Sequence, residues 1–182
     1  MQFFRYGIFT LTLVLLTACS TGVRSLANQG TLAAQAQWAV LPIANNTDTP
    51  QAALSAESMV EHLLRSRGVT NLLQYPVALT RDSLFEPTER KVSEEAQKWA
   101  VGKGVRYAVT GSVEEWRYKV GIDGEPAVGV TLKVVDLVSG RVVWSGSAAK
   151  SGWSRQALSA VAQTVLTDLL TGLPLSQDKL SR

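Results

Sequence analysis

The chain has few of the residues from which catalytic and metal sites are most often built. Among its 182 residues there is one cysteine, Cys19, and one histidine, His62. A single cysteine excludes an intramolecular disulfide, and a lone histidine gives little from which to assemble a zinc site or a Ser-His-Asp triad. The sequence also lacks a glycine-rich phosphate-binding loop of the Walker or dinucleotide pattern. We therefore expect a non-enzymatic protein without a metal or other cofactor, in which His62 is a structural or surface residue.

A strong excess of one charge is also missing. Lys and Arg number 18 against 15 Asp and Glu, and loss of Arg5 with an N-terminal signal would leave 17 against 15. A nucleic-acid-binding protein is expected to concentrate basic residues in a stripe with interleaved aromatic residues. We therefore expect no nucleic acid among the partners of this chain.

No apolar run is long enough to span a membrane. Arg5 precedes an apolar stretch over residues 8–19, whereas a spanning helix needs about 20 apolar residues. A charged start, a short apolar core and small residues before a cleavage point are typical of a secretory signal. We predict that residues 1–18 are a signal peptide.

The cleavage point is typical of a lipobox. Leu16, Thr17 and Ala18 precede Cys19, whose thiol could accept a diacylglycerol group. The alternative is an ordinary secretory signal followed by a chance cysteine, but the one cysteine stands at the one position that lipidation requires. Each buried methylene contributes about 0.8 kcal/mol, so several acyl chains give a practically permanent anchor. Ser20 follows the cysteine, which by resemblance to bacterial lipoprotein sorting favours the inner leaflet of the outer membrane, with the domain facing the periplasm.

The remaining sequence, about 164 residues, is long enough for one domain with a single core. Residues 19–37 are small and polar without a sustained period, which predicts a flexible lipid-anchored tether. Residues 38–175 form the predicted domain, and residues 176–182 form a C-terminal tail.

The first half of the domain reads as strand, helix, strand, helix. The apolar run over residues 38–43 predicts a buried strand. Thr49 is a predicted N-cap with Pro50 at the first helical position, and this helix ends at Gly68. A short strand is predicted over residues 71–75, and a second helix follows Thr88 and ends near Gly102.

The second half reads as a three-stranded meander and a helix. Strands are predicted over residues 106–120, 128–134 and 141–148, joined by turns at Asp123-Gly124 and Ser139-Gly140. A last helix is predicted from Ser154. The order predicts an α/β fold, a single-domain three-layer-type sandwich with a mixed sheet flanked by helices.

Two sets of residues stand out beyond the core pattern. Glu114 and Glu115 could pair as carboxylates, but adjacent residues of a strand point to opposite faces and would not share a site. Trp153 stands apart from the core periods. With Ser154 as N-cap, it could pack on Leu158 as a hydrophobic staple; alternatively, it is exposed and contacts lipid.

Several segments carry a resemblance to known families. Residues 38–52, WAVLPIANNTDTPQA, resemble the opening strand and turn of TolB N-terminal and CsgG-like periplasmic domains. Residues 84–91, 111–132 and 144–163, which include LFEPTERK and WSGSAAKSGWSRQALSAVAQ, resemble the PelC family of outer-membrane lipoproteins from the Pel exopolysaccharide secretion apparatus.

This resemblance implies a ring of identical subunits, dodecameric in the family, that acts with PelB, an outer-membrane barrel with a tetratricopeptide scaffold. The exported polymer would be a cationic amino-sugar chain, guided to the pore by an acidic ring face. The resemblance implies that Trp153 contacts lipid. It makes Asp123 and Glu125, at the proposed hairpin tip, the first candidates for the acidic face, before Glu114 or Glu115. The alternative interpretation is that these carboxylates at the hairpin tip are solvated and have no role in binding.

A second hypothesis is a monomeric regulatory lipoprotein of the same fold that activates an envelope enzyme. Such an activator needs a long reach across the periplasm. The predicted tether has fewer than twenty residues, which disfavours this alternative.

Overall fold

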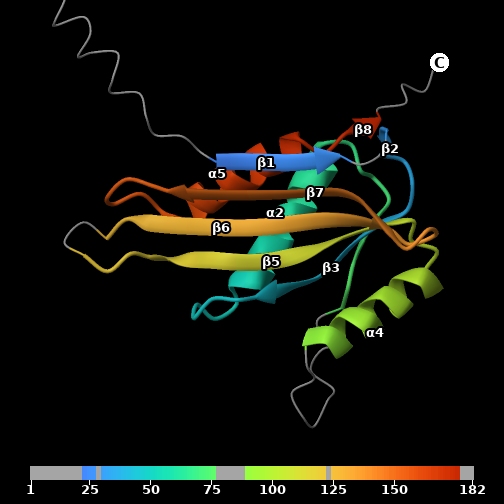
Figure 1. Cartoon of the computed structure of the whole chain (residues 1–182), viewed down its shortest axis with the longest axis horizontal. Helices are drawn as coiled ribbons and strands as arrows, with labels where there is room; N and C mark the ends of the chain where they lie inside the picture. Colours follow the sequence, from blue (N-terminus) through green and yellow to red (C-terminus); the bar gives the residue numbers. More distant parts are fainter. Residues whose placement is uncertain (1–21, 28–29, 77–88, 122–123, 177–182) are drawn as a thin grey trace, which may run out of the picture.

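The computed structural model describes residues 22–27, 30–76, 89–121 and 124–176. These residues form one six-stranded sheet, a two-stranded ladder and three helices (Figure 1). The sheet order is β1 (Gly22–Ala27), β7 (Arg141–Ser151), β6 (Pro126–Asp136), β5 (Tyr107–Tyr118), β3 (Trp38–Asn45) and β4 (Leu72–Gln74). The helices are α2 (Ala52–Ser66), α4 (Glu89–Gly102) and α5 (Leu158–Thr171), and β2 (Leu32–Ala33) pairs with β8 (Leu175–Ser176).

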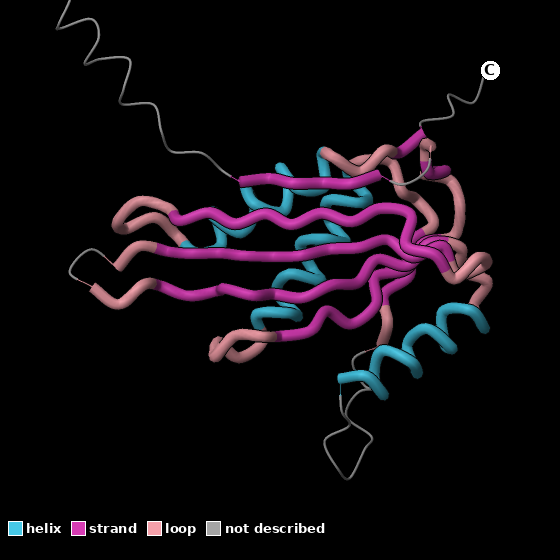
Figure 2. The backbone as a smooth tube through the Cα atoms, in the orientation of Figure 1, coloured by secondary structure: helices cyan, strands magenta, loops and turns pink. Residues whose placement is uncertain are grey.

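The sheet is mixed. Strands β5, β6 and β7 form an antiparallel meander, whereas β3 is parallel to both β4 and β5. The connection through α2 leads from β3 to the edge strand β4. The connection through α4 leads in the opposite direction, from β4 past β3 to β5. Because such crossovers are right-handed, opposite directions of movement place the two helices on opposite faces. Figures 1 and 2 show α2 and α5 behind the sheet, whereas α4 packs on Ala39, Leu41 and Ala108, whose positions alternate with those that face α2 and α5. The helices therefore cover opposite faces, which confirms the predicted three-layer α/β sandwich.

The larger core lies between the sheet and the helices α2 and α5. Trp38 and Trp144 are completely buried in it, and each indole N–H donates to a backbone carbonyl, that of Ala33 and Gly172 respectively, at 3.0 Å. Buried indole N–H groups need such a partner, because an unsatisfied donor would carry a desolvation cost of about 1–3 kcal/mol. These two bonds fix the segments before β3 and after α5 to the core.

The smaller core lies beneath α4. Its buried residues include Ala39, Leu41 and Ala108 from the sheet and Ala96 from the helix, with Trp99 packed against the cluster. This helix packs at the β3 end of the sheet. Over β6 and β7, the same face of the sheet carries exposed Lys133, Ser147 and Ala149. We call this face, outside the area beneath α4, the open face of the sheet.

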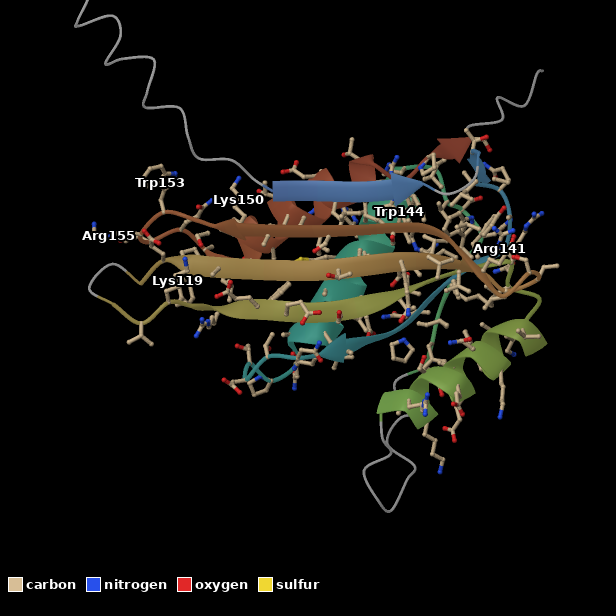
Figure 3. All side chains as sticks on the ribbon, in the orientation of Figure 1. Lys119, Arg141, Trp144, Lys150, Trp153 and Arg155 are labelled. Atoms are coloured by element: carbon tan, nitrogen blue, oxygen red, sulfur yellow. The ribbon has the colours of Figure 1, made fainter. Side chains whose placement is uncertain are left out.

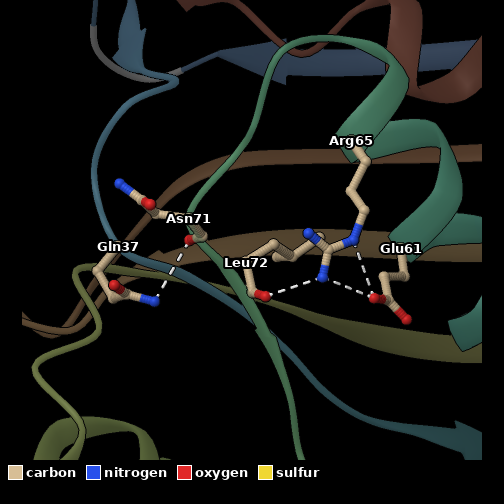
Figure 4. Close-up of polar contacts among 5 residues, drawn as sticks. All are labelled: Gln37, Glu61, Arg65, Asn71 and Leu72. Atoms are coloured by element: carbon tan, nitrogen blue, oxygen red, sulfur yellow. Dashed lines mark hydrogen bonds and ion pairs between the residues drawn. The ribbon is translucent and has the colours of Figure 1, made fainter.

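The β3–β4 edge is closed by side chains. Arg65 of α2 pairs with Glu61 at 2.9 Å and donates to the carbonyl of Leu72 in β4 at 3.0 Å (Figure 4). Gln37 donates to the carbonyl of Asn71 at 3.4 Å, at the other side of the same strand start. These contacts hold the short edge strand against α2.

Beyond the end of β4, the exposed edge of β3 offers little for another strand to pair with. Pro42 has no N–H, and the N–H of Ile43 donates to the buried carboxylate of Glu57 at 2.8 Å. Edge strands with few free donors resist pairing with other chains. The β3 edge is therefore an unfavourable place for sheet extension.

The predicted start of the first helix is wrong by a few residues. Helix α2 begins at Ala52, and its N-cap is Gln51, whose φ of 61° lies in the left-handed region. Thr49 does not cap the helix, because its hydroxyl donates to the carbonyl of Trp116 in β5. A tertiary partner has thus displaced the local capping bond that the sequence favours.

The tether predicted over residues 19–37 contains folded structure. Residues 22–27 form strand β1, antiparallel to β7 with Gly22 opposite Ala149 and Ala27 opposite Trp144. Leu32 of β2 and Ala34 are buried in the domain. The domain therefore begins before residue 38. The sequence did not show this because an edge strand is recruited by the free backbone groups of its neighbour and needs no apolar alternation of its own.

Candidate functional site

Two loops meet at the end of the sheet where β5 and β6 are joined and where β7 leads into α5. The N–H of Gly152 donates to the carbonyl of Pro126 at 2.7 Å, and the N–H of Leu158 donates to the hydroxyl of Tyr118 at 3.0 Å. We call this region, residues 118–121, 124–126 and 150–158, the loop end of the molecule. Figure 3 shows Lys119, Lys150, Trp153 and Arg155 there.

Trp153 projects from the loop end into solvent with 76% of its surface exposed. Its loop is held by two hydrogen bonds to Gln156. The side-chain oxygen of Gln156 accepts from the backbone N–H of Trp153 at 3.2 Å, and the backbone N–H of Gln156 donates to the carbonyl of Trp153 at 3.0 Å. Gly152 precedes it, and a Cβ there would lie 2.5 Å from that side-chain oxygen and 2.6 Å from Val161. The indole is thus exposed on an ordered loop.

The predicted helix start at Ser154, and the staple that depended on it, are wrong. Helix α5 begins at Leu158 with Ala157 as its N-cap, so Ser154 does not cap it. The turn between β7 and the helix is longer than the sequence suggested because Arg155 takes a left-handed conformation with φ 68°. A non-glycine residue in this region is a poor helix start.

The acidic candidates are only partly within the described residues. Glu125 is half-buried at the loop end, and its carbonyl accepts from the N–H of Lys119 at 2.7 Å. Asp123 lies outside the described residues, and the neighbouring Gly124 has φ 51°. The pairing of Tyr118 with Pro126 confirms a β5–β6 hairpin. Glu125 and Trp153 therefore lie at the same end of the molecule.

Cys19 also lies outside the described residues, which begin three positions later at Gly22. Strand β1 begins at Gly22, opposite Ala149 and close to Lys150. Three Cα–Cα steps separate residues 19 and 22, which span at most about 11 Å. The first described residue after Cys19, Gly22, therefore lies next to the loop end.

The premise of regular alternation at Glu114 and Glu115 is wrong because β5 contains a bulge, although the conclusion that they share no site is not contradicted. The register of β5 against β6 shifts between Val113 and Glu115, and both Val113 and Trp116 are buried in the larger core. With two residues between these core positions, Glu114 and Glu115 both lie outside the core. Hydrogen bonds from Ser112 and Asn46 lower the pKa of Glu114.

Glu115 shares the open face with other side chains. Its oxygen lies 3.1 Å from the guanidinium of Arg117, and its Cβ lies over Gly129, where a Cβ would be 3.5 Å away. The two glutamates are thus engaged with Ser112, Asn46 and Arg117. These contacts show a hydrogen-bonded surface and give no sign of a shared acid-base pair.

A pocket of about 710 Å³ lies between the start of α2, the start of α4 and the strands β3, β5 and β6. Glu57 contributes the one buried carboxylate to its lining, with 6% of its surface exposed. Burial raises the pKa of Glu57, and the hydrogen bond from the N–H of Ile43 lowers it by a smaller amount. In the fold, this carboxylate accepts a hydrogen bond from a backbone N–H at the free edge of β3.

Within the described part of the chain, no three His, Cys, Asp or Glu residues are close enough together to hold a metal ion. His62 is exposed on α2, in line with the sequence prediction. None of the described helices has the length and apolarity that crossing a membrane requires.

No protein-family model and no curated protein matches the sequence. Among solved structures, a PelC dodecamer from Paraburkholderia phytofirmans is 38% identical with a TM-score of 0.73, over 87% of this chain and 100% of that one. A second PelC dodecamer from the same organism, a variant with a single substitution, is also 38% identical with a TM-score of 0.74, over 86% of this chain and 100% of its own. The chain belongs to the PelC family.

The PelC fold extends to more distant proteins. The lipoprotein GNA1162 from Neisseria meningitidis is 18% identical with a TM-score of 0.57, over 75% of this chain and 96% of that one. At this identity the likeness concerns the fold alone. It confirms the α/β architecture predicted from the sequence.

The sequence prediction missed three cations of this PelC-family loop end. Lys119 lies in the β5–β6 connection, whereas Lys150 lies near the end of β7 and Arg155 in the loop after it, and no local motif links the three. Only the pairing of β5 with β6 and of β6 with β7 brings their positions to one end. The one available signal was the proximity of Lys150 and Arg155 to Trp153 in the sequence.

Proposed function

We propose that this chain is a non-enzymatic, lipid-anchored subunit of a Pel-type exopolysaccharide export machine. Its anchor is Cys19 in the inner leaflet of the outer membrane, and its domain faces the periplasm. The match to two PelC dodecamers over their entire length carries this proposal.

The proposed assembly is a ring of identical subunits, as the dodecameric relatives suggest. A ring needs two different surfaces on each subunit that fit each other and close after a fixed rotation. The ring would act with PelB, whose barrel provides the outer-membrane pore. The position of Glu125 supports a refinement: because it lies at the same end as Trp153, the acidic residues would surround the exit of the ring, next to the membrane.

The proposed cargo is a cationic amino-sugar polymer. In the proposed ring, Asp123 and Glu125 face the opening, where carboxylates repeated from subunit to subunit can sum to a potential of several kT, whereas Lys119, Lys150 and Arg155 face away from it. Repulsion between subunits opposes this arrangement but is screened beyond about 8 Å at physiological salt. In the proposed orientation, the exposed indole of Trp153 contacts the lipid interface, where aromatic rings with a polar N–H are favoured.

The combined substitution Asp123→Asn and Glu125→Gln tests the guiding role. It removes two charges per subunit with little change of shape, and we expect less secreted polymer because the attraction is lost. Secreted polymer is measured by a lectin or antibody assay, and the solution mass and membrane fraction of the variant are measured alongside it. The pair Glu94→Gln and Glu95→Gln, on exposed positions of α4, is the matched control. Unchanged secretion from correctly assembled rings would exclude Asp123 and Glu125 from the polymer path.

A further inference from the structure

The loop end carries three cations at the same end of the molecule as Trp153. Lys119 follows β5, Lys150 lies near the end of β7, and Arg155 lies in the loop after it (Figure 3). We call these three residues the basic cluster. Lys119 and Arg155 are exposed, and Lys150 is half-buried.

The charges of the basic cluster are not neutralised by described partners. The ion pairs among the described residues are Glu61 with Arg65, Asp136 with Arg106 and Glu115 with Arg117. The ammonium of Lys119 instead donates to the neutral hydroxyl of Ser151 at 2.6 Å. On the described part of the β5–β6 hairpin tip, half-buried Glu125 is the carboxylate that accompanies these three cations. The described loop end therefore has an excess of positive charge.

Exposed apolar side chains accompany the cations. Tyr118 and Val120 flank Lys119 in the sequence, with 51% and 101% of their surfaces exposed, and Trp153 is 76% exposed. An aromatic residue, an aliphatic residue and long cationic side chains on one surface are typical of proteins that lie on a membrane interface. A site for a soluble anion would not need the exposed apolar groups.

The position of β1 indicates which partner this surface contacts. In the proposed anchoring, the Cα atom of lipidated Cys19 lies at most about 11 Å from that of Gly22, and Gly22 pairs with Ala149, next to Lys150. A lipidated chain cannot move its loop end far from the headgroups. The cations are thus held where an anionic bilayer surface would attract each of them.

We propose that Lys119, Lys150 and Arg155 bind the headgroups of anionic phospholipids and orient the subunit with Trp153 in the interface. This inference rests on the proposed function, because it assumes the Cys19 anchor. The cluster provides lipid selectivity, whereas Trp153 and Val120 provide affinity for any bilayer. Each Lys or Arg near an anionic surface raises the binding constant by about fivefold, so three cations should raise the binding constant for anionic vesicles on the order of a hundredfold.

Vesicle binding by the mature chain with Cys19→Ser tests the inference without the lipid anchor. Binding is measured by co-sedimentation with vesicles of phosphatidylcholine alone and with vesicles that also contain phosphatidylglycerol. The triple variant Lys119→Gln, Lys150→Gln and Arg155→Gln should lose the preference for the anionic vesicles, by on the order of a hundredfold. The matched control is Lys91→Gln, Lys98→Gln and Lys103→Gln, which removes the same charge from exposed positions on and after α4.

A second variant separates the two contributions. Trp153→Ala should weaken binding to both kinds of vesicle by the same factor and leave the anionic preference intact. Higher salt should weaken the binding of the unmodified Cys19→Ser chain to anionic vesicles only, which provides a readout even if the triple variant fails to fold. Equal binding of the triple variant and its α4 control to anionic vesicles, or salt-independent binding, would overturn the inference.

The proposed function is tested by a different measurement, the solution mass. If the Cys19→Ser chain has the solution mass of a monomer at every concentration, the proposed ring is contradicted while the vesicle comparison can still be read. If that chain forms a large oligomer but shows no anionic preference, only the role of the basic cluster is contradicted.

Discussion

Glu57 accepts a hydrogen bond from the backbone, but burial of its carboxylate disfavours the charged form. Its carboxylate accepts the N–H of Ile43 at 2.8 Å, and burial raises its pKa above the ordinary value of 4.5. With a raised pKa, the folded state holds its proton more tightly than the unfolded state does. The stability from this residue is fully present below pH 4.5 and declines as the pH rises through the raised folded value.

Glu57→Gln should therefore flatten the dependence of stability on pH. The amide oxygen can still accept the N–H of Ile43, and no charge must be buried. Urea unfolding at pH 5 and pH 8 should show a smaller loss of stability at the higher pH for the variant than for the original chain. A steeper loss in the variant would show that the charged carboxylate stabilises the fold.

Glu57→Ala is the informative comparison. It removes the acceptor and leaves the N–H of Ile43 without this hydrogen-bond partner, which should lower the free energy of unfolding by about 1–3 kcal/mol. If Glu57→Ala were as stable as Glu57→Gln at both pH values, the bond to Ile43 would not be needed for the edge of β3.

At the scale of the element, β5 shows how packing can reverse a sequence argument. Alternation along a regular strand predicts that Glu114 and Glu115 face opposite ways. The bulge inserts one extra residue, so both lie outside the core. Near this irregularity, β5 and β6 approach closely at Gly111, where a Cβ would lie 2.0 Å from the backbone oxygen of Thr131.

Gly111→Ala should destabilise the domain because a backbone oxygen cannot move aside as the end of a flexible side chain can. The expected cost is about 1–3 kcal/mol, measured by thermal unfolding as a lower Tm. Gly102→Ala, at the end of α4, is the matched control: nothing lies within 4 Å of a Cβ there, and alanine favours a helix over glycine. A Tm for Gly111→Ala equal to that of the control would show that the β5–β6 approach is not tight.

At the scale of the whole molecule, β1 is the strand that links the fold to the proposed lipid anchor. Without it, the predicted tether would let the domain rotate freely beneath the bilayer. With β1 paired to β7, at most a few residues separate Cys19 from the sheet. Under the proposed Cys19 anchor, the topology of the sheet brings the loop end to the membrane, together with Trp153 and the basic cluster.

Cys19→Ala should abolish acylation and stable membrane attachment while leaving the domain folded, because the described fold begins after this residue. Membrane fractionation in cells without PelB measures attachment, and the Tm of the purified domain measures folding. Full retention of the variant in the outer-membrane fraction would show that a contact other than the lipid holds the protein there.

The sequence by itself determined the α/β class, the order of most elements and the burial of Trp38, because apolar periods and glycine turns are local signals. It also predicted a lipobox at Cys19, which remains a prediction, and it carried the motifs of the PelC family. The tertiary structure alone decided the pairing of β1 with β7, the bulge of β5, the start of α2 and the position of Lys119, Lys150 and Arg155 at the same end as Trp153. Each of these depends on backbone bonds or contacts between segments far apart in the chain, and such contacts leave no regular period in the sequence.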